Sequence, residues 1–145
     1  MASVSTYLSF PRTCEEAFNF YKSVFRSEFQ GDITRMGDTP ADPNNPIPEA
    51  DRNLICNIAL PITGGHILMG ADACEWMGYP FIEGNNISLT LHPESREETD
   101  RLFAALSEGG KVDMPMQDMF WGDYFGTLID RFGIHWMLNY SDALA

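Results

Sequence analysis

The stretch from residue 120 to residue 140 constrains the fold of this chain more than any other segment. Its first half alternates, with Phe125, Thr127 and Ile129 separated by Gly126 and Leu128, which is the two-residue period of a β-strand. Residues 130–133, Asp-Arg-Phe-Gly, then supply turn chemistry, and residues 134–140 return to β-branched and aromatic side chains. The segment predicts a β-hairpin, and a hairpin of this kind closes a β-α-β-β-β module.

The rest of the chain predicts this module twice. The second copy would consist of a strand at 86–91, a helix capped by Ser95 and stopped by the glycine pair at 109–110, a strand at 111–116 and the hairpin. The first copy would consist of a strand at 3–10, a helix at 14–26 capped by Thr13, a strand at 28–36, a long proline-rich loop at 37–52 and a hairpin from 53–60 and 66–71. We therefore predict an α+β fold of two tandem modules within one domain, residues 1–145, with module one at about 1–72, a linker at 73–84 and module two at about 85–145.

Composition excludes several classes of function. The net charge is −12, and the nine Lys and Arg residues are not clustered, so neither nucleic acid nor an anionic membrane surface is an expected partner. The three cysteines have no C-x-x-C spacing, which argues against a disulfide framework and a zinc cluster. No apolar run approaches the ~20 residues of a membrane span, and the first residues lack the pattern of a signal peptide. A cytoplasmic location is expected.

Three segments carry a resemblance to a known family. They are Y-L-S-F at 7–10 leading into C-E-E-A-F-N-F-Y at 14–21, I-L-M-G-A-D at 67–72, and W-G-D-Y-F-G at 121–126 followed by D-R-F-G at 130–133. With these segments the chain resembles the vicinal-oxygen-chelate superfamily (glyoxalase I, bleomycin-resistance proteins and extradiol dioxygenases), and within it the PhnB-like branch. The resemblance implies curved mixed sheets that enclose a cleft, usually in a homodimer.

The resemblance also indicates where a metal would bind. Enzymes of this superfamily hold a divalent ion with His and Glu side chains from the first and last strands of each module, and the corresponding positions here are Ser5, Met69, Asn86 and Met137. Hydroxyl, amide and thioether groups are poor ligands for such ions, so no metal site and no cofactor are predicted. A shift of one residue would bring in His66 or His135 but no complete His and carboxylate set. A metal-dependent lyase, isomerase or dioxygenase with such a shifted site is the alternative interpretation.

The same face would instead suit a small organic ligand, because it mixes soft apolar surface with a few polar groups. The candidate ligand-binding residues on the strands are Ser5, Tyr7, Ser9, Ile67, Met69, Asn86, Ser88, His135 and Met137. Aromatic residues expected at the lips of the cleft are Trp76, Tyr79, Phe81, Trp121 and Tyr124. Each has a purely structural alternative: the methionines as core filler, His135 bonded within the sheet, and Trp121 as packing.

The sequence identifies no catalytic residue. We predict a metal-free PhnB-like protein that binds a small organic molecule. Methyltransferase activity, a label attached to relatives in this branch, is not supported, because no glycine-rich strand-to-helix turn is followed by an acidic residue. A module that uses the linker aromatics to bind a partner protein is a further possibility. Cys14 could be reactive at a helix start or inert, and the scarcity of nearby basic residues favours an inert thiol.

Overall fold

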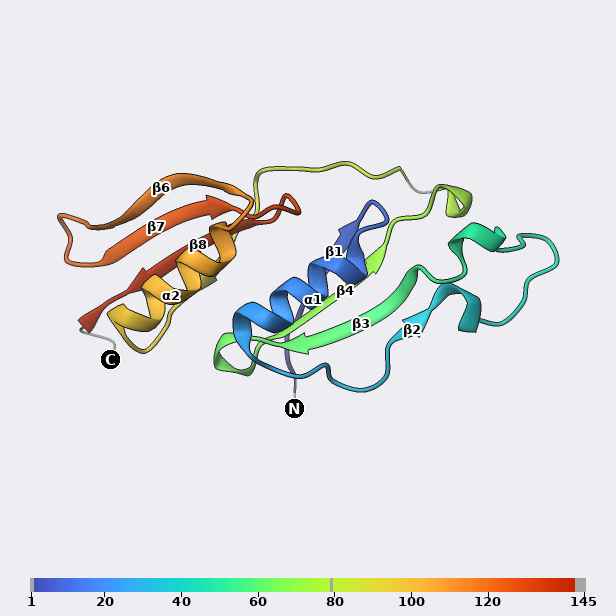
Figure 1. The fold of residues 1–145 in the computed structure, drawn as a ribbon, viewed down its shortest axis with the longest axis horizontal. Helices are drawn as coiled ribbons and strands as arrows, with labels where there is room; N and C mark the ends of the chain where they lie inside the picture. Colours follow the sequence, from blue (N-terminus) through green and yellow to red (C-terminus); the bar gives the residue numbers. More distant parts are fainter. Residues whose placement is uncertain (1, 79, 143–145) are drawn as a thin grey trace. The chain divides into compact units, whose positions relative to one another are not determined.

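The computed structural model describes residues 2–78 and 80–142, which form two compact units within residues 1–82 and 83–145 (Figure 1). The first unit contains β1 (Thr6–Phe10), α1 (Cys14–Phe25), β2 (Thr34–Arg35), β3 (Ile55–Pro61) and β4 (Ile67–Asp72). The second contains β5 (Leu89–Leu91), α2 (Arg96–Ser107), β6 (Lys111–Asp118), β7 (Tyr124–Ile129) and β8 (His135–Tyr140).

The two units have the same topology. Their four-stranded sheets run in the orders β1-β4-β3-β2 and β5-β8-β7-β6. In each, the first and last strands of the unit are parallel and the other pairs are antiparallel. The predicted α+β fold with two β-α-β-β-β modules is confirmed.

Each helix packs on one face of the sheet of its own unit. In the first unit the fully buried residues include Phe18 and Tyr21 of α1 and Leu68 of β4. Gly70 lies beneath the helix, where an added Cβ would come within 2.6 Å of the Phe18 ring. In the second unit the buried residues include Leu102 and Leu106 of α2 with Leu128, Trp136 and Leu138 of the sheet. Burying a side chain of this kind contributes about 1.5–3 kcal/mol.

Three predicted strands are markedly shorter than expected, and the one predicted at 3–10 begins at Thr6. Only Thr34 and Arg35 of the predicted strand at 28–36 are extended and paired. Arg26 and Gly31 have positive φ angles of 51° and 72°, and such left-handed residues interrupt an extended chain. The strand predicted at 86–91 is limited to Leu89–Leu91.

The helix caps differ between the modules. The Ser95 hydroxyl accepts a hydrogen bond from the Glu98 N–H at 3.0 Å, which confirms Ser95 as the cap of α2. The Thr13 side chain makes no cap bond. The N–H of Cys14 instead donates to the Asp72 carboxylate at 2.9 Å, so the start of α1 is held by the end of β4.

Candidate functional site

Each sheet has a second face that the helix of its own unit does not cover, and we call it the helix-free face. Along the last strands, Leu68, Gly70 and Asp72 and then Trp136 and Leu138 are buried toward the helices. Because side chains alternate along a strand, the residues between them point the other way. The predicted ligand-binding residues of the last strands, Ile67, Met69, His135 and Met137, all lie on helix-free faces and are half-buried.

On the first unit the helix-free face is organised around Met69. Met69 lies between Tyr7 of β1 and Ala59 of β3 in register. The Ser5 hydroxyl is 3.6 Å from the Met69 sulfur, and the Tyr7 hydroxyl donates to the Cys56 carbonyl at 3.4 Å. Burial, and then the negative charge that Cys56 and Cys14 would carry when ionised, raise the pKa of Tyr7, so its hydroxyl stays a neutral donor. Ser5, Tyr7 and Ser9 are exposed at alternate positions, as predicted for one face.

On the second unit Met137 has the corresponding place. It lies between Thr90 of β5 and Thr127 of β7, and Met114 of β6 lies beyond Thr127. His135 is opposite Ile129 in the next row. This face therefore presents two thioethers, two hydroxyls and one imidazole.

The strand register corrects the expected position of one residue. Leu68 and Trp136 are equivalent, because each is the second residue of its strand and lies opposite a buried leucine, Leu60 or Leu128. Their partners on the first strands, Thr6 and Leu89, are therefore equivalent too. It follows that Ser88, one residue before Leu89, is the counterpart of Ser5. Asn86, which the resemblance places there, lies two residues further from β5.

The residues at the four equivalent positions, Ser5, Met69, Ser88 and Met137, do not fit a divalent cation. Thioethers prefer soft ions, and neutral hydroxyls add no charge. Among the described residues no group of three or more His, Cys, Asp and Glu side chains could hold a metal ion. His66 is engaged elsewhere, since its Nε2 is 2.9 Å from the Thr6 hydroxyl.

The predicted lip residues are placed differently from one another. Trp121 is 52% exposed and stacks edge-on against Phe120. Trp76 has a buried indole N–H with no hydrogen-bond partner among the described residues. Phe81 is 38% exposed, and Tyr79 lies outside the described residues. Ser88, a predicted strand residue of the site, is half-buried just before β5.

Tyr124 is not brought together with His135 and Met137. It alternates in phase with the buried residues Gly126 and Leu128, so it lies on the helix side of its sheet. Its hydroxyl donates to Asp100 of α2 at 2.5 Å, and the Arg96 guanidinium lies 3.8 Å from its ring centroid. The bond to Asp100 raises the pKa of Tyr124, and this side chain fastens β7 to α2.

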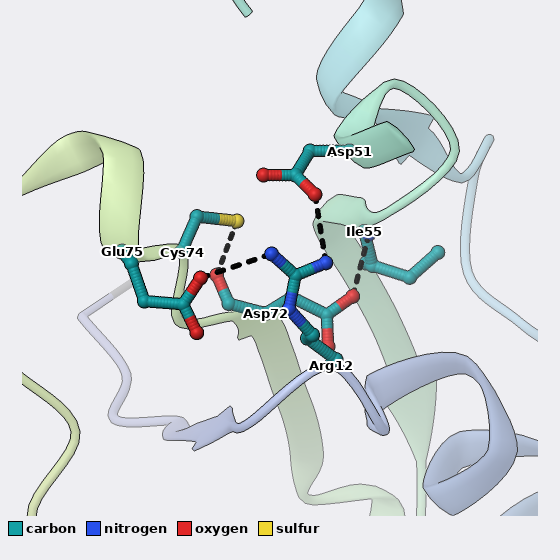
Figure 2. Close-up of polar contacts among 6 residues, drawn as sticks. All are labelled: Arg12, Asp51, Ile55, Asp72, Cys74 and Glu75. Atoms are coloured by element: carbon teal, nitrogen blue, oxygen red, sulfur yellow. Dashed lines mark hydrogen bonds and ion pairs between the residues drawn. The ribbon is translucent and has the colours of Figure 1, made fainter. Parts of the chain in front are cut away.

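A polar cluster that the sequence did not reveal holds the first unit together (Figure 2). Arg12, with a φ of 69°, donates to the buried Asp51 at 2.7 Å and to Glu75 at 3.0 Å, and these bonds, the one to Asp51 first, raise its pKa. Asp72 is 5% exposed and accepts the N–H groups of Cys14 and Ile55 at 2.9 and 2.8 Å. The cluster joins the loop at 37–52 and the segment after β4 to the start of α1. It brings together residues 12, 51 and 72–75, which are far apart in sequence, so no local pattern could have indicated it.

A cavity of about 260 Å³ opens within the proline-rich loop. It contains none of the predicted site residues, and its lining consists of Thr39, Ala41, Asp42, Pro43, Pro46, Ile47 and Arg52.

Cysteine reactivity provides a direct test of this geometry. Cys14 starts α1, a position that can lower a thiol pKa, but burial and then the charge of Asp72 raise it strongly. Burial likewise raises the pKa of Cys74, whereas Cys56 is half-buried. We expect Ellman's reagent to modify Cys56 first at pH 8 and to reach Cys14 and Cys74 only after denaturant is added. A fast reaction that persists in Cys56→Ser would contradict this order.

No helix among the described residues is long and apolar enough to cross a membrane.

Comparison with known proteins assigns the fold and the family. The duplicated module is the fold of the glyoxalase/bleomycin-resistance/dioxygenase class. A Burkholderia phytofirmans enzyme described by that name shares the fold with a TM-score of 0.60 at 15% identity, over 93% of this chain and 96% of that one. A family model described as 3-demethylubiquinone-9 3-methyltransferase matches residues 2–139, and the chain belongs to this family, which is the PhnB-like branch.

Three relatives are similar over nearly the whole chain. Protein YjdN of Escherichia coli is 30% identical over 94% of this chain and 93% of its own length. The crystal structure of PA1353 from Pseudomonas aeruginosa is 33% identical with a TM-score of 0.82, covering 97% of this chain and 98% of that one. A Bacillus cereus PhnB protein, described as a putative 3-demethylubiquinone-9 3-methyltransferase, is 27% identical with a TM-score of 0.74, covering 97% and 100%.

Proposed function

We propose that this PhnB-like chain is a metal-free protein that binds a small organic molecule against the helix-free faces of its sheets. The observation that carries the proposal is a methionine beside a hydroxyl in each module: the Ser5 hydroxyl is 3.6 Å from the Met69 sulfur, and Met137 lies next to Thr90 in register. Ser5, Met69 and Met137 are positions at which the resemblance expects metal ligands, and Ser88 is the counterpart of Ser5 in the second module. Polarisable thioethers beside hydroxyls suit contact with an organic ligand. The cleft between sheets, the homodimer and the cytoplasmic location that we predicted from the sequence are part of this proposal.

The shifted-metal alternative finds less support. His66 is bonded to Thr6 on the helix side of its sheet. His135 does lie on a helix-free face, but its neighbour in register is Ile129. A single imidazole without a carboxylate beside it provides one of the three ligands that a catalytic metal centre usually needs.

The methyltransferase in the family description is not part of the proposal. The connection from β1 to α1 is Pro11-Arg12-Thr13 and the one from β5 to α2 is H-P-E-S at 92–95. Neither contains the glycines that let a backbone approach a nucleotide-like cofactor. The first N–H of α1 is also already bonded to Asp72.

Methionine methyl NMR tests the proposal at the residues that carry it. With ¹³C-methyl methionine, pooled small polar aromatic compounds should shift the signals of Met69 and Met137. Met36, which is 4% exposed, serves as the internal control and should not move. A panel in which no compound shifts Met69 or Met137, while nickel or zinc does, would contradict the proposal.

A further inference from the structure

The distribution of charged residues over the strands restricts which ligands the helix-free faces can accept. The described strands contain five residues that are charged at pH 7, namely Arg35, Asp72, Lys111, Asp113 and Asp118. The chain as a whole has 21 Asp and Glu and nine Lys and Arg. Most of its charge is therefore in helices and loops.

Three of the five charged strand residues form ion pairs or hydrogen bonds with the helix of their own unit. Arg35 pairs with Glu15 of α1 at 2.7 Å, and Asp118 pairs with Arg96 of α2 at 2.5 Å. Asp72 accepts the first N–H of α1. None of these side chains is available to a molecule on a helix-free face.

The remaining two are at the edge of the second sheet. Lys111 and Asp113 belong to the outermost strand β6, with side chains 77% and 41% exposed and their Nζ and Oδ1 atoms 4.0 Å apart. They are solvated and face each other. Inward of that edge, the strand residues of both helix-free faces therefore contribute hydroxyl, amide, imidazole, thioether, aromatic and aliphatic groups.

We infer that the helix-free faces select uncharged organic ligands and discriminate against both anions and cations. This inference rests on the proposed function. A charge moved from water onto such a face loses hydration and finds no opposite charge to replace it. An anion is further repelled by the net charge of −12. A neutral ligand can use the hydroxyl groups of Ser5, Tyr7, Thr90 and Thr127 as hydrogen-bond partners at no such cost.

Three isosteric probes test the inference: benzamide, benzoate and benzamidinium, which carry charges of 0, −1 and +1. Chemical shifts of the Met69 and Met137 methyls, titrated against each probe, report affinity at the faces. We expect benzamide to bind at least about tenfold more tightly than either ion, with benzoate the weakest. Benzamide affinity should not change with salt.

A designed countercharge makes the test sharper. Thr90→Asp places a carboxylate beside Met137 and should raise benzamidinium affinity about tenfold while leaving benzamide nearly unchanged. Ala104→Asp adds the same charge on the exposed side of α2 and should do neither. Thr127→Asp, on the neighbouring strand, replaces the first variant if that one does not fold.

The outcomes separate this inference from the proposed function. Tighter binding of benzoate or benzamidinium to the native protein overturns the inference and leaves small-molecule binding intact. An equal gain of benzamidinium affinity in Ala104→Asp also overturns it, because the effect would then be the overall charge. If no probe binds, the proposed function fails, and the inference fails with it.

Discussion

Replacing Trp136 with alanine is expected to lower the free energy of unfolding more than any other single change considered for this chain. Trp136 is fully buried, and its indole N–H donates to the Asp130 carboxylate at 2.8 Å. Removing a large buried aromatic side chain costs about 3–5 kcal/mol, and a lost bond to a buried carboxylate adds about 1.5–3 kcal/mol. A loss of about 5 kcal/mol or more should appear in urea unfolding monitored by circular dichroism.

Two further variants separate packing from hydrogen bonding. Trp136→Phe keeps an aromatic ring but removes the donor, so a smaller loss of about 2 kcal/mol is expected. Trp121→Ala removes the same side chain from a site that is 52% exposed, and it should change stability by less than about 1 kcal/mol. Equal effects in Trp121→Ala and Trp136→Ala would show that the described core is wrong.

The second large effect is expected at Asp72. Asp72→Ala removes the acceptor of two backbone N–H groups, those of Cys14 and Ile55, and leaves both donors in a buried region. Each bond to a charged group contributes about 1.5–3 kcal/mol, so a loss of about 3–6 kcal/mol is expected for the two. Asp72→Asn should rescue little, because its amide NH₂ would face one of the two N–H groups in place of an oxygen.

Asp113 provides the matched control. It is also a strand aspartate, but its side chain is 41% exposed, and its Oδ1 atom lies 4.0 Å from the Lys111 Nζ atom. Exposed pairs of this kind contribute little, so Asp113→Ala should stay within about 0.5 kcal/mol of the native protein in the same urea unfolding experiment. If Asp72→Ala proved as mild as Asp113→Ala, the connection between β4 and the start of α1 would not be a structural one.

The parts of the fold that could be predicted are those fixed by local chemistry. The closing hairpin is one example: Asp130 bonds the N–H groups of Phe132 and Ile134, and Gly133 has a φ of 89°, as expected for a turn of this composition. The Ser95 cap is another, because a cap involves residues only three apart. The duplication could be predicted for the same reason, because the same order of strand and helix patterns occurs in both modules.

What could not be predicted depends on residues distant in the sequence. Thr13 has the chemistry of a cap, but Asp72 holds the start of α1, and only the folded sheet brings Asp72 there. The position of Ser88 opposite β8 follows from the pairing of Leu89 with Trp136, which no pattern within residues 86–91 reveals. Tyr124 was expected with the ligand-binding residues, yet its phase along β7 places it toward α2.

The most direct test of the central claim is a metal-binding measurement on the native protein. Protein purified without chelators would be incubated with nickel, zinc or ferrous iron, desalted and analysed for metal content, with the melting temperature recorded in parallel. Serine and methionine at the four equivalent positions predict far less than one metal per chain and an unchanged melting temperature. One tightly bound metal per chain, lost in His135→Ala, would contradict the account.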